Sequence, residues 1–214
     1  WSSWSASGDS RVIYVSATGS DSNDGLSTGA PKLTISAGEA LMRTGYPDHL
    51  LLKRGDTFLA QRLALPSTKS GRSNTERMVF GVYGPEADGR AIITSPGNDS
   101  FYNVGFGTTE HLAFFGWDIS APNRTTNPEC FLYGPATGGN VTWEDMQTTC
   151  DNVVFSRNHT HRSSSNGVQV RPGGEVEDNL CVRNAAGIHF GFRYGAASKV
   201  GGTSGTLSRN VVLN

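Results

Sequence analysis

The segment Gly167-Val168-Gln169-Val170 is repeated in residue type as Gly187-Ile188-His189-Phe190, 20 positions later. Short alternating segments at such a spacing are typical of a solenoid, in which each coil buries its apolar face only against the next coil. Neighbouring side chains on a strand face opposite sides. The apolar residues are therefore expected inside, and Gln169 and His189 outside, one above the other.

Three arginine–asparagine steps give a second spacing: Arg157-Asn158, Arg183-Asn184 and Arg209-Asn210, each 26 positions after the last. The equal interval predicts one step per coil, with the three arginines in a ladder. Asparagine tolerates the left-handed backbone of tight corners and can bond its own main chain. A structural role at corners is therefore expected for the asparagines at segment edges, which are Asn152, Asn158, Asn179, Asn184 and Asn210.

The composition agrees with many short strands joined by tight corners. The chain has 214 residues, of which 36% are apolar and 17% charged, and it contains 27 glycines. That is enough chain for one sizeable core, and it contains no apolar run long enough to cross a bilayer. Residues 1–150 hold 11 basic and 15 acidic side chains, whereas 151–214 hold 7 basic and 4 acidic. A mildly cationic second part favours an anionic partner, but the charge is too small to indicate nucleic acid.

The N-terminal part predicts a strand, a turn, a helix and a second strand in that order. Residues 11–16 alternate as a strand does, and residues 18–25 are dense in turn formers. Ser36 and Glu39 have the spacing of a capping box, which predicts a short helix that stops near Gly45. Within the turn, Asp21, Asn23 and Asp24 do not complete a calcium-loop pattern, so a plain turn is expected.

This N-terminal arrangement resembles the cap of many secreted right-handed parallel β-helix proteins of the pectate-lyase-like superfamily. The resemblance lies in Tyr14-Val15-Ser16, the turn from Gly19 to Gly25, the short helix, and the apolar strand running into Arg54-Gly55-Asp56-Thr57-Phe58. It continues more loosely through early strand-like segments at 78–84, 91–94 and 111–119. The resemblance implies a carbohydrate-directed function for roughly residues 11–214.

The fold class expected from repeat and resemblance is all-β, a right-handed parallel β-helix with a short helix-containing N-terminal cap. Residues 1–10 are expected to be a flexible lead-in, about 11–60 the cap, and about 61–214 the coils. The last segment, 207–214, stops within a strand-like stretch, so the coils are expected to continue beyond it or to be covered by another chain.

One candidate site is a group of basic and polar residues in the second part of the chain. Polysaccharide lyases need a cation or a metal to neutralise a uronate carboxylate, and a base to remove the proton at C5. The candidate catalytic residues are Arg171, His189, His161 and Arg162. The candidate substrate-binding residues are Gln169, Arg193, His159 and Tyr194. The alternative is that these are solvated polar residues on an exposed sheet face.

A second candidate site is built from carboxylates. Glu175 and Glu177 are two positions apart and would share one face of a strand, where they could bind calcium or act as a glycosidase pair. Calcium is therefore a possible cofactor, although the reaction does not require one. The sequence shows no dense array of aspartates, and solvated charges are the alternative.

Cysteines and the chain start bear on the compartment. Cys130 and Cys150 could form one disulfide if the compartment is oxidising, and three unpaired thiols are the alternative. A start at Trp1 without methionine indicates a mature or trimmed chain, so an extracellular or cell-surface location is expected. Four glycosylation sequons begin at Asn98, Asn123, Asn140 and Asn158, and chance matches are common in a chain this rich in Ser and Thr.

Two functions of different classes follow. The first is a lyase-type enzyme on an acidic, uronate-containing polysaccharide, with hydrolase or epimerase chemistry left open. The second is a non-catalytic adhesin, fibre or surface-layer module that assembles through its open coil end. The expected partner is an anionic polysaccharide, with self-association as a further possibility and with no nucleic acid and no membrane span.

Overall fold

A computed structural model describes residues 4–61, 63, 69–94, 102–103, 111–120, 146–147, 153–161, 166–170, 175–177, 179–182, 186–190 and 206–213. Strands dominate these residues. The strands are β1 (Val12–Val15), β2 (His49–Lys53), β3 (Thr57–Phe58), β4 (Met78–Tyr83), β5 (Ala91–Thr94), β6 (Tyr102–Asn103), β7 (Leu112–Phe115), β8 (Trp117–Ser120), β9 (Met146–Gln147), β10 (Val153–Ser156), β11 (His159–His161), β12 (Asn166–Val170), β13 (Glu175–Glu177), β14 (Leu180–Val182), β15 (Ala186–Phe190), β16 (Thr206–Ser208) and β17 (Val211–Leu213).

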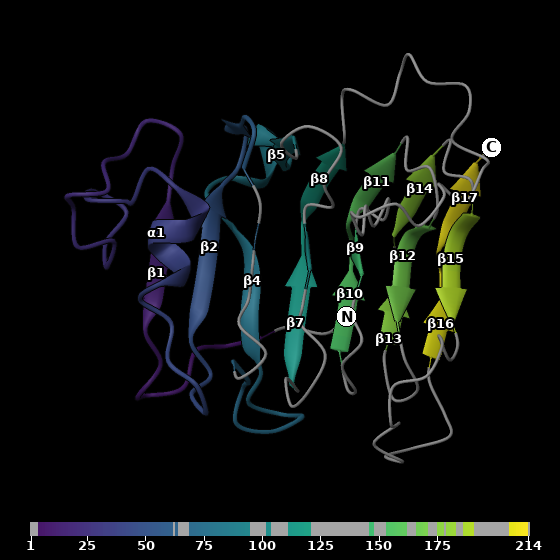
Figure 1. Ribbon diagram of the computed structural model, residues 1–214, viewed down its shortest axis with the longest axis horizontal. Helices are drawn as coiled ribbons and strands as arrows, with labels where there is room; N and C mark the ends of the chain where they lie inside the picture. The colour runs from purple at the N-terminus through teal and green to yellow at the C-terminus, as the bar shows by residue number, and fades with distance from the viewer. Residues whose placement is uncertain are drawn as a thin grey trace, which may run out of the picture.

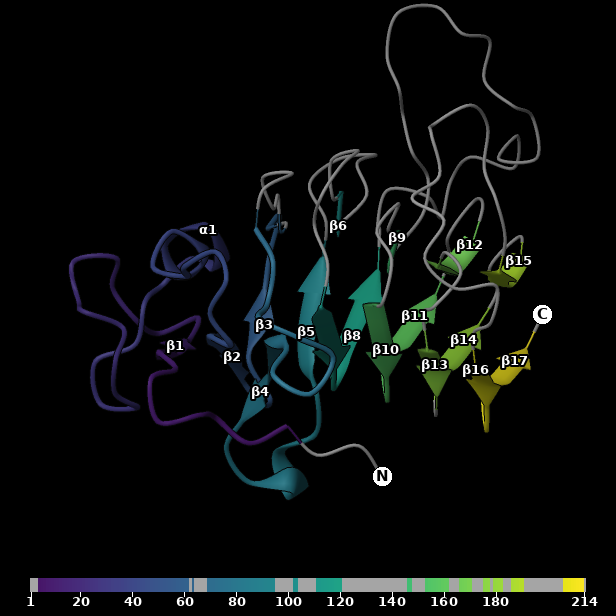
Figure 2. The ribbon, with the colours of Figure 1, turned by 90° about the horizontal axis from the view of Figure 1, so that it is seen from below.

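The strands form three sheets, and every described strand pair is parallel. Sheet A has the order β1-β2-β4-β7-β10-β13-β16, sheet B has β17-β14-β11-β8-β5-β3, and sheet C has β15-β12-β9-β6. From β4 onward the described strands enter sheets A, B and C in turn. The colours of Figures 1 and 2 therefore run along the long axis, from purple at β1 to yellow at β16 and β17. This confirms the prediction of an all-β chain with parallel sheets.

The helix predicted near residue 36 is present, but its predicted cap is wrong. Helix α1 spans Ile35–Glu39, and its N-cap is Thr34, whose hydroxyl accepts a hydrogen bond of 3.1 Å from the backbone N–H of Ala37. Ser36 lies inside the helix. Thr34 has extended φ and ψ angles of −109° and 146°, as an N-cap residue does, and this geometry decides where the helix begins.

Sharp corners join sheet A to sheet B. The segment at 111–119 divides at Gly116, where φ is +80°, so that β7 belongs to sheet A and β8 to sheet B. Arg157 and Arg209 occupy the same kind of corner in later passes of the chain, with φ of 55° and 50°. A residue with a left-handed backbone bends the chain sharply between the two strands, which continuous strand geometry cannot do.

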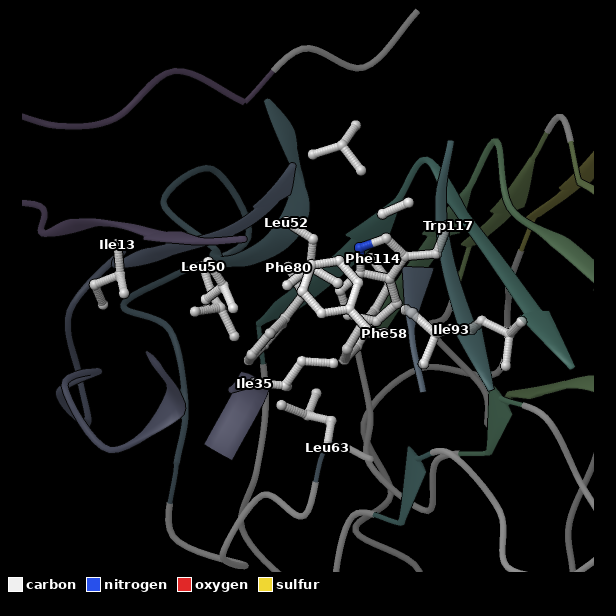
Figure 3. Close-up of a cluster of buried hydrophobic side chains, with 14 of the residues drawn as sticks. Ile13, Ile35, Leu50, Leu52, Phe58, Leu63, Phe80, Ile93, Phe114 and Trp117 are labelled. Carbon is white, nitrogen blue, oxygen red and sulfur yellow. The ribbon is translucent and has the colours of Figure 1, made fainter. Parts of the chain in front are cut away.

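The hydrophobic core of the described residues lies between the sheets, and its members run from Ile13 to Ile119. Its largest side chains come from strands in sheets A and B, and Figure 3 shows several of them around Phe80 and Phe114. The rings of Phe80 and Phe114 stack at 4.8 Å between centroids, and Trp117 meets Phe114 edge-on at 5.7 Å. Trp117 is fully buried and donates its indole N–H to the carbonyl of Gly81 at 3.1 Å.

The register confirms one of the two predicted spacings and corrects the other. Val168 of β12 pairs with Ile188 of β15, 20 positions later. The 26-residue interval is wrong as a coil spacing: His159 pairs with Leu180, 21 positions on, and Leu180 pairs with Val211, 31 positions on. Asn179, rather than Asn184, therefore lies in register between Asn158 and Asn210. Arg183, the middle member of the expected arginine ladder, lies outside the described residues. In the chain it follows β14 of sheet B, whereas Arg157 and Arg209 follow β10 and β16 of sheet A.

The segment before β1 runs back along the outside of sheet A. In Figure 2 the purple chain ahead of β1 passes beneath β4, and Trp4 stacks on Phe115 of β7 at 5.4 Å between centroids. Ser7 donates to the carboxylate of Glu76 at 2.7 Å. Asp9 pairs with Arg72. Residues 1–10 were expected to be a flexible lead-in, and the described residues 4–10 contact Phe115 and the segment that holds Arg72 and Glu76.

Candidate functional site

The two predicted site residues that the structure brings together are Gln169 and His189. They are register partners in β12 and β15 of sheet C, between the pairs Val168–Ile188 and Val170–Phe190. Gln169 also pairs with Gln147 of β9, and Gln147 pairs with Asn103 of β6. One row across four strands of sheet C therefore holds Asn103, Gln147, Gln169 and His189, which we call the sheet C polar row.

Sequence reasoning missed Asn103 and Gln147. Each lies in a strand of two described residues, too short for alternation to reveal it. The steps along the row are also unequal, because Asn103 and Gln147 are 44 positions apart whereas Gln147 and Gln169 are 22 apart. One sequence signal could have revealed these two residues. The apolar residues Met146, Val168 and Ile188, which directly precede Gln147, Gln169 and His189, are themselves register partners.

The other predicted residues of the cationic group lie elsewhere or outside the described residues. His159 and His161 belong to β11 of sheet B, where they are register partners of Asp118 and Ser120. Several further predicted residues lie outside the described part of the chain: Arg162, Arg171, Arg193, Tyr194, Cys130 and Cys150. Arg171 directly follows the end of β12, which places it in the chain next to the strand that carries Gln169.

The two predicted calcium ligands, Glu175 and Glu177, lie in β13 of sheet A. Glu175 pairs with Thr206 and Glu177 with Ser208, and Glu177 also pairs with Ser156. These residue types all carry oxygen atoms, which calcium prefers, but two carboxylates supply only part of its usual six to eight ligands. The pair is in a different sheet from Gln169 and His189. Among the described residues, no cluster of three or more His, Cys, Asp or Glu side chains could hold a metal ion.

A buried row of asparagines ties together the corners between sheets A and B. Asn158 is fully buried; its side-chain oxygen accepts from the N–H of Trp117 and its amide donates to the carbonyl of Phe114, both at 3.2 Å. The N–H of Asn158 donates to the side-chain oxygen of Asn179 at 2.9 Å, and the N–H of Asn179 donates to that of Asn210 at 3.0 Å. The structural role predicted for these three asparagines is confirmed.

The burial of Asn158 also excludes glycosylation at one of the four sequons. The side chain of Asn158 has no exposed surface and its amide is hydrogen bonded on both sides, so it cannot carry a glycan in the folded protein. The remaining two asparagines expected at corners, Asn152 and Asn184, lie outside the described residues, as do the sequons at Asn98, Asn123 and Asn140.

The described groups whose pKa is shifted lie between Asp9 and Tyr83, away from the sheet C polar row in the chain. Burial alone would raise the pKa of Asp48, but hydrogen bonds from Arg43 and from the backbone N–H of Arg11 hold it below its usual value. Burial lowers the pKa of the neighbouring His49. Arg43 also lies 3.9 Å above the ring of Tyr46. These contacts join the lead-in, the turn after α1 and the start of β2, which is a structural role.

The turn from residue 18 to residue 25 is closed by its own polar side chains. Asp21 accepts hydrogen bonds from the N–H groups of Leu33 and Thr34, both at 2.9 Å, and Asn23 donates to the carbonyl of Pro31 at 2.8 Å. Asp24 accepts from the N–H of Leu26. These contacts confirm the expected turn and leave the two carboxylates bonded to the main chain.

Comparisons with known proteins give only distant likenesses. No protein-family model matches the chain, and no curated protein matches it. Among solved structures it is similar to a GH136 lacto-N-biosidase from Eubacterium ramulus, with 16% identity and a TM-score of 0.47 over 94% of this chain and 30% of that one. It is also similar to a rhamnogalacturonan lyase, with 13% identity and a TM-score of 0.44 over 94% of this chain and 67% of that one.

A third similar structure is the pectate lyase Pel9A, with 15% identity and a TM-score of 0.41 over 98% of this chain and 62% of that one. The chain thus spans about a third of the length of the lacto-N-biosidase and about two thirds of the two lyases. Likenesses of this degree assign no function to the chain. In the part of the chain that the structure describes, no helix has the length and apolar character needed to cross a membrane.

Proposed function

We propose that this chain is an extracellular carbohydrate-active protein that cleaves an acidic, uronate-containing polysaccharide by β-elimination. The observation that carries the proposal is the sheet C polar row, in which Asn103, Gln147, Gln169 and His189 follow one another across four parallel strands. We propose that the amide and imidazole groups of this row face solvent, where they would offer repeated hydrogen-bonding positions to an extended polymer at the spacing of neighbouring strands.

We propose that the architecture is a parallel β-helix, which would support this function. The described strands enter sheets A, B and C in turn, and each strand pairs in parallel with the one from the next pass. Crossovers between parallel strands of one sheet are right-handed in nearly all proteins, so we infer a right-handed winding. Such stacking places equivalent residues of successive passes side by side, and an extended polymer could bind along them.

The reaction needs an acidified proton and a base. A positive charge from Arg171, which follows β12 directly, would neutralise the uronate carboxylate and acidify the proton at C5. The neutral imidazole of His189 would take that proton, and the C5–H electron pair would form the C4=C5 double bond. The bond from C4 to the glycosidic oxygen breaks, and the leaving oxygen gains a proton from solvent. Gln169, beside His189 in the row, would bind a sugar hydroxyl.

A calcium ion, if it binds, would lie in a different sheet from the proposed catalytic residue His189. Glu175 and Glu177 with their hydroxyl-bearing register partners supply the oxygen atoms that calcium prefers, but they lie in sheet A. A calcium ion there would stabilise the carboxylate-rich strand β13. We therefore expect the β-elimination to proceed in the presence of a chelator.

The test is turnover of defined polymers. The wild-type protein is incubated with pectate, alginate and glycosaminoglycans, with calcium and with chelator, and the absorbance of the new double bond is followed. We expect unsaturated product from one polymer, and a loss of at least about a hundredfold in kcat for His189→Ala, as for removal of a general base. The matched control is His111→Asn, because His111 pairs with Asn74 outside the row and has a φ of 58° that asparagine tolerates.

Two results would reject the lyase proposal: no unsaturated product from any of these polymers, or His189→Ala with the same rate as His111→Asn. Reducing ends without a double bond would indicate hydrolysis instead.

A second candidate function is a non-catalytic module that assembles through β17. The observation in its favour is that all three residues of this strand, Val211, Val212 and Leu213, are about half exposed. Exposed apolar residues on one strand favour association with another apolar surface. The test is sedimentation of the wild type and of Val212→Lys. Concentration-dependent assembly that the lysine abolishes would support the module, and a monomer at all concentrations would reject it.

A further inference from the structure

The outer face of sheet A carries a small apolar surface that one residue of the N-terminal segment covers. Val79 of β4 and Ala113 of β7 alternate with the core residues of their strands, so they face away from the main core, yet both are buried. Phe115 packs against them from the same face of the sheet, and Trp4 packs over them from the N-terminal segment. We call Val79, Ala113 and Phe115 the outer aromatic surface, and residues 4–10 the strap.

The contact between strap and surface is a ring stack. The planes of Trp4 and Phe115 are 26° apart and their centroids are separated by 5.4 Å. The guanidinium of Arg157 lies 5.3 Å from the centroid of the same phenyl ring. An aromatic ring gives a sugar ring a flat apolar surface to stack on, and a cation over the same ring attracts a carboxylate carried by that sugar.

The strap itself is weakly attached apart from this ring. Its sequence is Trp4-Ser5-Ala6-Ser7-Gly8-Asp9-Ser10, in which Trp4 is the one large apolar residue. The remaining ties are polar contacts near the surface: Ser7 to Glu76, the side chain of Asp9 to Arg72, and the carbonyl of Asp9 to Arg43. Exposed ion pairs and hydrogen bonds of this kind contribute little to stability. A segment that is held by one aromatic contact and a few exposed polar contacts can detach from sheet A without unfolding the sheets.

We propose that the outer aromatic surface is a second polysaccharide-binding surface, distinct from the sheet C polar row, and that the strap covers it by placing Trp4 where a sugar ring binds. This inference rests on the proposed function for its ligand, a uronate oligosaccharide. The sugar ring stacks on Phe115 above Val79 and Ala113. The positive charge of Arg157 favours a carboxylate-bearing sugar over a neutral one. Strap and ligand compete, so the affinity of the wild type is lowered by the fraction of molecules in which the strap is closed.

The experiment measures binding of uronate oligosaccharides prepared from pectate, alginate and a glycosaminoglycan, by titration calorimetry on the full chain. Trp4→Ala removes the competing ring and is expected to raise the affinity at least about threefold, since it increases the open fraction. Phe115→Leu keeps the apolar cover over Val79 and Ala113 but removes the aromatic face. We expect it to lower the affinity at least about fivefold, as the loss of a stacking platform does.

A matched pair tests the cation. Arg157→Gly removes the positive charge beside Phe115 at a corner whose φ of 55° suits glycine. Arg209→Gly makes the same change at a corner with a φ of 50° in a later pass of the chain. We expect the first to weaken binding of uronate oligosaccharides and the second to leave it unchanged.

The outcomes separate the inference from the function on which it rests. If the wild type binds an oligosaccharide and neither Trp4→Ala nor Phe115→Leu changes the affinity, the strap inference is overturned and the proposed function is not. If Trp4→Ala weakens binding, Trp4 belongs to the binding surface and does not cover it, which also overturns the inference. If no variant binds any oligosaccharide, both fail. Equal effects of Arg157→Gly and Arg209→Gly would overturn the role of the cation.

Discussion

At the scale of single residues, Asn158 shows how one polar side chain holds several passes of the chain in register. Its oxygen accepts from Trp117, its amide donates to Phe114, and its main chain bonds Asn179 and Leu180. All of these bonds lie away from solvent, where an unmatched donor or acceptor is costly. The side chain therefore replaces the strand hydrogen bonds that a sharp corner interrupts.

We expect Asn158→Ala to lower the free energy of unfolding by about 2–4 kcal/mol, because it leaves the N–H of Trp117 and the carbonyl of Phe114 without this partner in a buried site. The matched variant is Asn210→Ala, at a less buried position of the same row, where we expect about 1 kcal/mol. Denaturant unfolding measures both. Equal losses in the two variants would contradict the importance of burial.

His49 carries the second residue-scale prediction. Burial lowers its pKa below the ordinary value of about 6.5, and the nearby Asp48 only partly opposes this. The unfolded chain therefore takes up a proton at His49 as the pH falls through about 6.5, while the folded chain resists it. The contribution of His49 to stability is complete above that pH and is lost as the pH falls towards the lower, folded-state pKa.

We expect His49→Gln to reduce the loss of unfolding free energy between about pH 7.5 and about pH 5.5, relative to the wild type. Unfolding curves at the two pH values measure this difference. His111→Asn serves as the control, since it retains His49 and should keep most of the wild-type slope. A variant at position 49 with the wild-type slope would show that this residue does not link folding to pH.

At the scale of elements, the N-cap of α1 is not the residue that the sequence pattern predicts. Ser36 and Glu39 match a capping box, but Thr34 is the residue whose hydroxyl accepts from the helix. The carboxylate of Asp21 accepts from both the N–H and the hydroxyl of Thr34, each at 2.9 Å. The turn at 18–25 thus fixes Thr34 in place, and the helix begins after it.

Thr34→Ala is expected to lower the free energy of unfolding by about 1 kcal/mol, the usual loss for an N-cap side chain. Ser36→Ala is expected to change it by less than about 0.5 kcal/mol, because Ser36 lies within the helix and caps nothing. Thermal or denaturant unfolding of the two variants decides between the caps. A larger loss of unfolding free energy in Ser36→Ala than in Thr34→Ala would show that Ser36 is the N-cap residue.

At the scale of the whole molecule, the passes of the chain differ in length while their strands stay in register. Successive partners in sheet B are 21 and 31 positions apart, because the segments between strands vary in length and the strands themselves do not. The interval of 26 that the arginine–asparagine steps suggest is the mean of these two. The 20-residue match in sheet C was read correctly because it compares two strands that pair directly.

The sequence by itself determined several of the longer strands, the short helix and the parallel pairing of Val168 with Ile188, because alternation and turn chemistry are local properties that one chain segment carries alone. Only the tertiary structure decided which asparagines stack, that Thr34 caps α1, that Asn103 and Gln147 join Gln169 and His189, and that Trp4 reaches Phe115. These contacts join residues separated by connections of unequal length. Their partners are fixed by strand register and burial, and neither is visible in the spacing of residues along the chain.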